Sequence, residues 1–338
     1  MEQHQSMTSA DTGTQAQQTP PGGPAAPTPS VLSRTMIGAG LVTALLALLW
    51  VDYQGPHHWL PGLVTDRLTG LSDLLQDGLL TALVVAVIMA AALREYCCMA
   101  KRIGAEVPCA YLVVCGLAIF LLQWPGWAFE HGKFLVCPAL LRSPEATAMV
   151  VLWVATIMLL CWMVLSGQVE KSIGRAGAFA FGLVYIPVML GFLGGLRVRW
   201  GVPGVVTVLA VCKLTDIGAY YAGTFIGGPR LAPRVSPRKT WAGAIGGTTA
   251  AVVMSLALSA IHLSPLSLPI AALYGLMLGP VAVLGDLAES LMKRQAGVKD
   301  SGNLLHGYGG VLDIIDDVLF AVPFSYLFFA VALAGAQA

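Results

Sequence analysis

Charged residues are scarce in this chain, and their scarcity argues against an ordinary soluble domain. Asp, Glu, Lys and Arg make up 11% of the 338 residues, hydrophobic residues make up 57%, and the mean hydropathy is +0.75. Soluble domains are nearer about 45–50% apolar. The length would allow about two soluble domains, but the apolar excess favours one polytopic membrane domain. The formal net charge of +1 gives no sign of a nucleic-acid partner.

Two further absences concern the N-terminus and the cysteines. The first 30 residues have almost no large apolar side chains and are rich in Gln, Thr, Pro and Gly. They cannot bury a core, so we expect residues 1–33 to form a disordered cytoplasmic tail. They also lack the basic start and short apolar core of a signal peptide. The seven cysteines form no CxxC pair, which favours apolar packing over a zinc site or a disulfide.

Long apolar runs are what the chain has in abundance. Each is long enough to cross about 30 Å of hydrocarbon, and together they predict an all-α, polytopic integral membrane protein with about nine transmembrane helices. We divide it into an N-terminal transmembrane region at 34–200 and a catalytic transmembrane region at 201–338. The predicted spans are 35–51, 79–96, 108–124, 147–165, 176–196, 203–223, 242–262, 268–289 and 316–335.

Lys and Arg are unevenly distributed between the predicted loops. With the N-terminus in the cytoplasm, most of them lie on the cytoplasmic side, as the positive-inside rule requires. We therefore expect a protein of the plasma (inner) membrane whose polar segment 290–317 faces the cytoplasm, where nucleotides are found. The basic residues left on the outer side are Arg67, Lys133, Arg142, Arg197 and Arg199.

The most informative segment is 290–317, SLMKRQAGVKDSGNLLHGYGGVLDIIDD, which lies between two apolar runs. Ionisable groups near hydrocarbon are costly unless they are paired or hydrated, so this concentration of charge indicates function. Cations beside clustered carboxylates favour a phosphate substrate held with Mg²⁺. The charged residues of the segment are Lys293, Arg294, Lys299, Asp300, Asp313, Asp316 and Asp317.

A second polar group begins in the sixth predicted span. Lys213 and Asp216 lie three residues apart on one helical face, which indicates either a self-contained ion pair or part of a binding site. The loop SPRKTW at 236–241 follows and supplies hydroxyl and cationic donors for phosphate. Its Pro237 suggests the start of the next helix, and Tyr220 is read as an interface anchor or as a stacking partner for a base.

Acidic helical faces flank the charged segment on both sides. Residues spaced i, i+3, i+4 and i+7 share one face of a helix, and a glycine-rich loop between the two faces allows them to meet. Two carboxylate faces beside a Lys-Arg loop favour a metal site over isolated structural carboxylates. The first face carries Asp286, Glu289, Ser290 and Lys293, and the second carries Asp313 and Asp316.

In order, these blocks resemble the signature of the phosphatidate cytidylyltransferases, or CDP-diacylglycerol synthases. The resemblance is sharp over about 203–320, and Arg94-Glu95-Tyr96 has a similar character upstream. Two positions depart from it, because the family usually places His where this chain has Tyr308 and Arg where it has Ile314. The matching residues are Asp216, Gly218, Ala219, Tyr220, Ser236, Pro237, Lys239, Thr240, Trp241, Gly243, Ser290, Lys293, Arg294, Lys299, Asp300, Ser301, Gly302, Gly309, Gly310, Asp313 and Asp316.

The resemblance implies that the chain transfers the cytidylyl group of CTP to phosphatidate, giving CDP-diacylglycerol and pyrophosphate for phospholipid biosynthesis. CTP, phosphatidate and membrane lipid are the implied partners, and a pair of Mg²⁺ ions is the implied cofactor. The implied metal ligands are Asp286, Asp313 and Asp316. The implied catalytic residues are Lys239, Lys293, Arg294, Lys299 and Asp300. The implied substrate-binding residues are Lys213, Asp216, Tyr220, Ser236, Arg238, Thr240, Ser290, Gly309 and Gly310.

Other functions are compatible with the same residues. A transporter would use the intramembrane charges Lys213, Asp216 and Asp286 to line an ion path. A catalytically weakened homologue, suggested by Tyr308 and Ile314, would bind lipid or nucleotide without turnover, and a related enzyme would use another lipid acceptor. The sequence leaves the oligomeric state open, a homodimer included.

Overall fold

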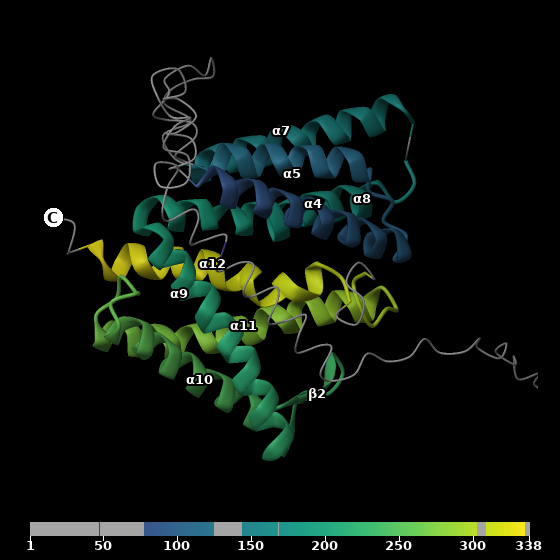
Figure 1. The fold of residues 1–338 in the computed structure, drawn as a ribbon. Coiled ribbons are helices and arrows are strands. Elements are labelled where there is room, and N and C mark those ends of the chain that lie inside the picture. Colours follow the sequence, from purple (N-terminus) through teal and green to yellow (C-terminus); the bar gives the residue numbers. More distant parts are fainter. Residues whose placement is uncertain (1–46, 48–77, 125–143, 168, 303–308, 335–338) are drawn as a thin grey trace, which may run out of the picture.

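The computed structural model describes residues 47, 78–124, 144–167, 169–302 and 309–334. Its helices form two groups, and one long helix crosses between them (Figure 1). The first group contains α4 (Leu79–Arg102), α5 (Cys109–Gln123), α7 (Pro144–Leu165) and α8 (Ser172–Leu183). The second contains α10 (Trp241–Ala260), α11 (Leu268–Gln295) and α12 (Leu312–Ala332). The crossing helix is α9 (Met189–Phe225), and the π-helical turn η1 (Val184–Val188) joins it to α8.

The predicted helical class is confirmed, whereas the count of nine spans is not. Five helical stretches of the described chain are long and apolar enough to cross a membrane. The predicted spans 176–196 and 203–223 belong to a single stretch, and 108–124 corresponds to the shorter α5. The predicted span 35–51 and the predicted tail 1–33 lie outside the described residues, apart from residue 47. The five stretches are Leu80–Arg102, Ser172–Phe225, Trp241–Ala260, Leu268–Gln295 and Leu312–Ala332.

Two features bend the long helical stretch from α8 to α9. Pro187 lies in η1. Because proline has no N–H to donate within a helix, it interrupts the regular hydrogen bonding where the chain forms the wider π turn. Gly201 has φ 67° and ψ −165°, a left-handed conformation that favours glycine, and Pro203 follows it. Two helices therefore meet at Gly201, inside the gap that the sequence predicted between the spans 176–196 and 203–223.

Small residues bring the helices of the second group close together. A Cβ on Gly218 of α9 would lie 2.5 Å from the Cβ of Ala250 in α10. A Cβ on Gly285 of α11 would lie 2.6 Å from the carbonyl oxygen of Asp316 in α12. Helices in a bilayer associate through such close contacts because there is little hydrophobic driving force between them. The contact at Gly285 also sets Asp286 beside the first turns of α12.

A short hairpin interrupts the helices after α9. Strand β1 (Arg230–Ala232) pairs antiparallel with β2 (Ser236–Thr240). Pro237 therefore lies in a strand, and the prediction that it starts the next helix is wrong. That helix, α10, begins at Trp241, and Thr240 caps it because its Oγ1 accepts a hydrogen bond from the Gly243 amide at 3.0 Å.

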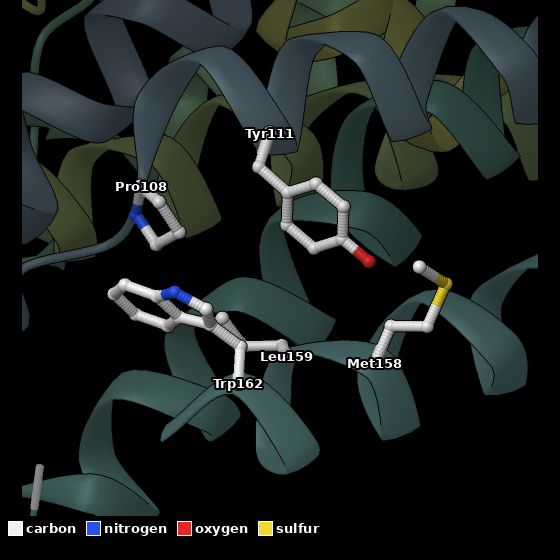
Figure 2. A pocket seen from close by; sticks show the side chains of 5 residues that line it. All are labelled: Pro108, Tyr111, Met158, Leu159 and Trp162. Atoms are coloured by element: carbon white, nitrogen blue, oxygen red, sulfur yellow. The ribbon is translucent and has the colours of Figure 1, made fainter. Parts of the chain in front are cut away.

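An open apolar cavity of about 320 Å³ lies between α5 and α7 in the first helix group. Figure 2 shows Tyr111 and Pro108 of the α5 side facing Met158, Leu159 and Trp162 of α7. The Tyr111 hydroxyl donates a hydrogen bond to the carbonyl of Ala155 at 3.0 Å. The cavity's lining carries no charged group and shares no residue with the polar clusters described below.

Candidate active site

Lys293 lies between two carboxylates at the C-terminal end of α11. Its Nζ is 2.6 Å from Oδ1 of Asp313 in α12, and it also pairs with Glu289 one turn back. Its side chain is 11% exposed, and that of Glu289 is fully buried. A buried cation needs such partners because desolvation is costly. The sequence placed Asp286, Glu289, Ser290 and Lys293 on one face, and the structure joins that face to Asp313.

Asp313 organises the polypeptide that precedes it. Its Oδ2 accepts hydrogen bonds from the Ser301 amide and hydroxyl, both at 2.8 Å, and from the Gly310 amide at 2.7 Å. Gly309 has φ 94°, and a Cβ there would lie 2.5 Å from that same oxygen. The two glycines of the signature are thus explained by a carboxylate that approaches the backbone closely. Both Asp313 oxygens have protein partners in this arrangement.

Glu95 of α4 is a site residue that the sequence analysis did not assign. Its Oε1 accepts a hydrogen bond from the Val311 amide at 2.9 Å, and its Oε2 accepts from the Leu312 amide at 2.8 Å and the Ser301 hydroxyl at 3.1 Å. A carboxylate from the first helix group therefore caps the N-terminus of α12. The available signal was an acidic residue inside an apolar run.

Lys213 connects α9 with the first turns of α12. Its Nζ donates to the carbonyl of Ile314 at 2.9 Å and to Oδ1 of Asp317 at 2.8 Å, and it lies 3.6 Å from Oδ2 of Asp216. The Asp317 side chain is fully buried. The sequence offered a self-contained pair of Lys213 and Asp216 as one interpretation, but the shorter contact is to Asp317, more than a hundred residues away in the sequence.

The hairpin contributes Lys239 to the same region. Its Nζ lies 2.6 Å from Oδ2 of Asp286 in α11, and Ser290 donates to Oδ1 of Asp286 at 3.3 Å. Arg294 fixes the hairpin to α11 because its Nε donates to the carbonyl of Val235 at 3.2 Å. Residues from three separated sequence blocks therefore meet at one end of the molecule.

Four carboxylates gather between α9, α11 and α12. Asp316 lies within electrostatic range of Asp286 and Asp317, and Asp216 also interacts with both of these. Carboxylate oxygens are the ligands that Mg²⁺ prefers, and the Asp286 side chain is 32% exposed. The donor chemistry therefore fits Mg²⁺. Within the described residues, however, no group of three or more such side chains is arranged to hold a metal ion, and Lys213 and Lys239 pair with two of these carboxylates.

The remaining predicted residues lie around this centre. Thr240 caps a helix, and Ser290 is a hydrogen-bond donor to a carboxylate, so neither is placed as a nucleophile. Gly309 and Gly310 contact Asp313 through the backbone. The partly or fully exposed residues are Tyr220, Ser236, Arg238, Arg294, Lys299 and Asp300.

The chain is similar to several known proteins. The sequence model of the cytidylyltransferase family matches residues 71–332. The chain belongs to this family. A phosphatidate cytidylyltransferase of Brucella suis is 43% identical over 173 residues, which are 51% of this chain and 63% of that protein. The Bacillus subtilis phosphatidate cytidylyltransferase is 34% identical over 178 residues, 52% of this chain and 66% of that protein.

A third relative is more similar over a shorter stretch. The phosphatidate cytidylyltransferase of Haemophilus influenzae is 50% identical over 123 residues, which are 34% of this chain and 42% of that protein. The aligned part of this chain thus spans less than two thirds of each of these curated relatives.

Proposed function

We propose that this protein transfers the cytidylyl group of CTP to phosphatidate and forms CDP-diacylglycerol and pyrophosphate. One observation carries the proposal: Lys239 of the hairpin, Asp286 of α11 and Asp316 of α12 lie together although they come from three sequence blocks. The relatives named phosphatidate cytidylyltransferase support the choice of substrates.

In the proposed reaction, an oxygen of the lipid phosphate attacks the α-phosphorus of CTP. The bond between that phosphorus and the oxygen leading to the β-phosphate breaks, and pyrophosphate leaves with the electron pair. The lipid phosphate is already anionic at neutral pH, so no strong base and no covalent nucleophile are required. The principal difficulty is the repulsion between two anions, which cationic groups must offset.

The cations of the site divide into two kinds. Lys293 and Lys213 are bound to buried carboxylates and hold α11, α12 and α9 in register. Arg238 and Lys299 are exposed and available to phosphate oxygens, whereas the exposed Arg294 already donates to the carbonyls of Val235 and Val298. Lys239 falls between the two kinds, because it is paired with a carboxylate, that of Asp286, which is itself partly exposed. We propose that Lys239 exchanges Asp286 for a phosphate of CTP when the nucleotide binds.

Mg²⁺ is the proposed cofactor, and Asp286 and Asp316 are the carboxylates best placed to hold it. Asp313 would join them only by giving up part of its bonding to Lys293, Ser301 or Gly310. A bound metal would supply positive charge to the triphosphate and its leaving group. We further propose that this end of the protein faces the cytoplasm at the inner membrane, as the distribution of Lys and Arg indicates.

The test uses the purified full-length protein in detergent micelles with phosphatidate and each of the four nucleoside triphosphates. We expect lipid-linked nucleotide with CTP and Mg²⁺, and loss of product with excess chelator. Asp286→Asn should remove turnover, whereas Glu106→Gln, which changes an exposed carboxylate of a 4.0 Å pair, should not. Ion flux without lipid product would instead support a transporter.

A further inference from the structure

A groove of about 700 Å³ follows one side of α4, and its other side is formed by Val298, Asp300, Ser301 and Gly302. Its lining changes character along the helix. Val87, Ala90 and Ala91 make one end apolar, and Arg94 and Arg102 make the other end cationic. Ala90 and Ala91 follow Val87 by three and four residues, Arg94 follows them by four and three, and Arg102 follows Arg94 by eight. These spacings place the five residues along one face of α4. The groove is therefore amphipathic along its length.

The two arginines of the groove are available to a ligand. Both side chains are exposed, and neither makes a hydrogen bond or ion pair with any part of the chain that the structure describes. This distinguishes them from Lys213, Lys239 and Lys293, each of which is bound to a carboxylate. Guanidinium groups bind phosphate oxygens through paired N–H donors.

Two carboxylates also line the groove, and they differ in their surroundings. Glu95 accepts hydrogen bonds from two amides at the N-terminus of α12 and from Ser301, so its charge is compensated there. Asp300 is exposed on the opposite wall. The positive groups thus lie on α4 and the uncompensated negative group lies across from them.

We propose that this groove binds phosphatidate, with the phosphomonoester between Arg94 and Arg102 and an acyl chain along Val87, Ala90 and Ala91. The inference rests on the proposed function and assigns the lipid to a subsite distinct from the Lys239 side. Val87 is 70% exposed at the apolar end, where a chain can enter from the bilayer. A nucleotide has no group to match that end, whereas a phosphomonoester lipid has both parts.

The groove also communicates with the proposed centre of reaction. Ser301 lines the groove, and its hydroxyl donates to Oδ2 of Asp313 at 2.8 Å. Glu95, which also lines it, bonds the backbone just before Asp313. A phosphate held by the arginines therefore lies next to the polypeptide that carries the signature carboxylates, which is where an attacking oxygen is needed.

The kinetic test compares Arg94→Gln, Arg102→Gln and the double variant with Lys101→Gln in the full-length protein. Lys101 is exposed on the same helix, carries the same charge and does not line this groove. We expect the KM for phosphatidate to rise about tenfold for each arginine, equivalent to about 1.4 kcal/mol, while the KM for CTP stays unchanged. Arg94→Lys should retain part of the affinity. An unchanged KM for phosphatidate, or an equal rise in the KM for CTP, would contradict the binding of phosphatidate in the groove.

A second readout needs no turnover. Cys98 is exposed and lines the groove between the two arginines, so phosphatidate should slow its reaction with a maleimide, measured on the Cys98 peptide by mass spectrometry. Inorganic phosphate should protect weakly because it lacks the acyl chain, and phosphatidylcholine should not protect because it offers the arginines no phosphomonoester. Protection that persists in the double variant would contradict the proposal. If the protein shows arginine-dependent protection but no cytidylyl transfer, the proposed function is refuted, whereas the binding of phosphatidate in the groove is supported.

Discussion

Glu95→Gln tests how the first helix group fixes the signature segment. Glu95 accepts three hydrogen bonds, from the Val311 amide, the Leu312 amide and the Ser301 hydroxyl. Hydrogen bonds to charged groups contribute about 1.5–3 kcal/mol each. A glutamine can present its oxygen to Leu312 and Ser301, but it then turns an NH₂ group toward the Val311 amide. It also removes a negative charge from the N-terminus of α12.

The expected loss is therefore about 2–4 kcal/mol, from one charged hydrogen bond and an unsatisfied amide. With an unfolding entropy of about 2.1 cal/mol/K per residue, a chain of 338 residues loses about 1.4 °C per kcal/mol, so the unfolding midpoint should fall by about 3–6 °C. The assay is thermal unfolding in detergent micelles, followed in parallel with cytidylyl transfer. Activity should fall at temperatures where the variant is still folded, because Ser301 and Asp313 lose their support.

The matched control is Glu106→Gln, which removes an equal charge from a pair at 4.0 Å whose glutamate side chain is 69% exposed. Such pairs contribute about 0–1 kcal/mol, so its midpoint should stay close to that of the wild type. If Glu95→Gln unfolds together with the control and keeps full activity, the capping of α12 by Glu95 is irrelevant to the site.

Three further predictions concern the acidic cluster and the tail. Asp286→Asn should abolish turnover while membrane insertion, checked by fractionation and gel filtration, is retained; full activity at physiological Mg²⁺ would refute the metal assignment. Lys213→Met should lower the free energy of unfolding by about 3–5 kcal/mol because it leaves Asp317 buried and unpaired. Adding Asp317→Asn should recover part of that stability, and Ile314→Arg should partly restore turnover in a double-mutant cycle; no change in either background would show that the charges do not compensate. Deleting residues 2–30 should leave specific activity nearly unchanged, and a large drop at equal expression would show that the tail docks on the domain.

The sequence predicted the ingredients of the site better than their pairing. Helical spacing correctly placed Glu289 and Lys293 on one face, because the i, i+4 relation is local to a helix. It could not show that Lys213 pairs with Asp317 or that Glu95 caps α12, since both contacts join residues far apart in the chain. Tertiary packing alone decides such partners.

The fold shows the same division between local and long-range information. Apolar runs located the described helices because length and hydropathy are properties of a segment. The break at Gly201 could be predicted because glycine followed closely by Pro203 is a local signal for the end of a helix. The hairpin at 230–240 was missed because Pro237 is equally compatible with a helix start and with an edge strand.

The central claim, that a lipid phosphate oxygen attacks the α-phosphorus of CTP at this site, is tested most directly by isotope tracing. The purified protein is supplied with CTP, Mg²⁺ and phosphatidate whose phosphate carries oxygen-18, and both products are examined by mass spectrometry. We predict CDP-diacylglycerol that retains all of the label together with unlabelled pyrophosphate, and neither product from Asp286→Asn. Label in the pyrophosphate, or an equal yield from Asp286→Asn, would contradict the account.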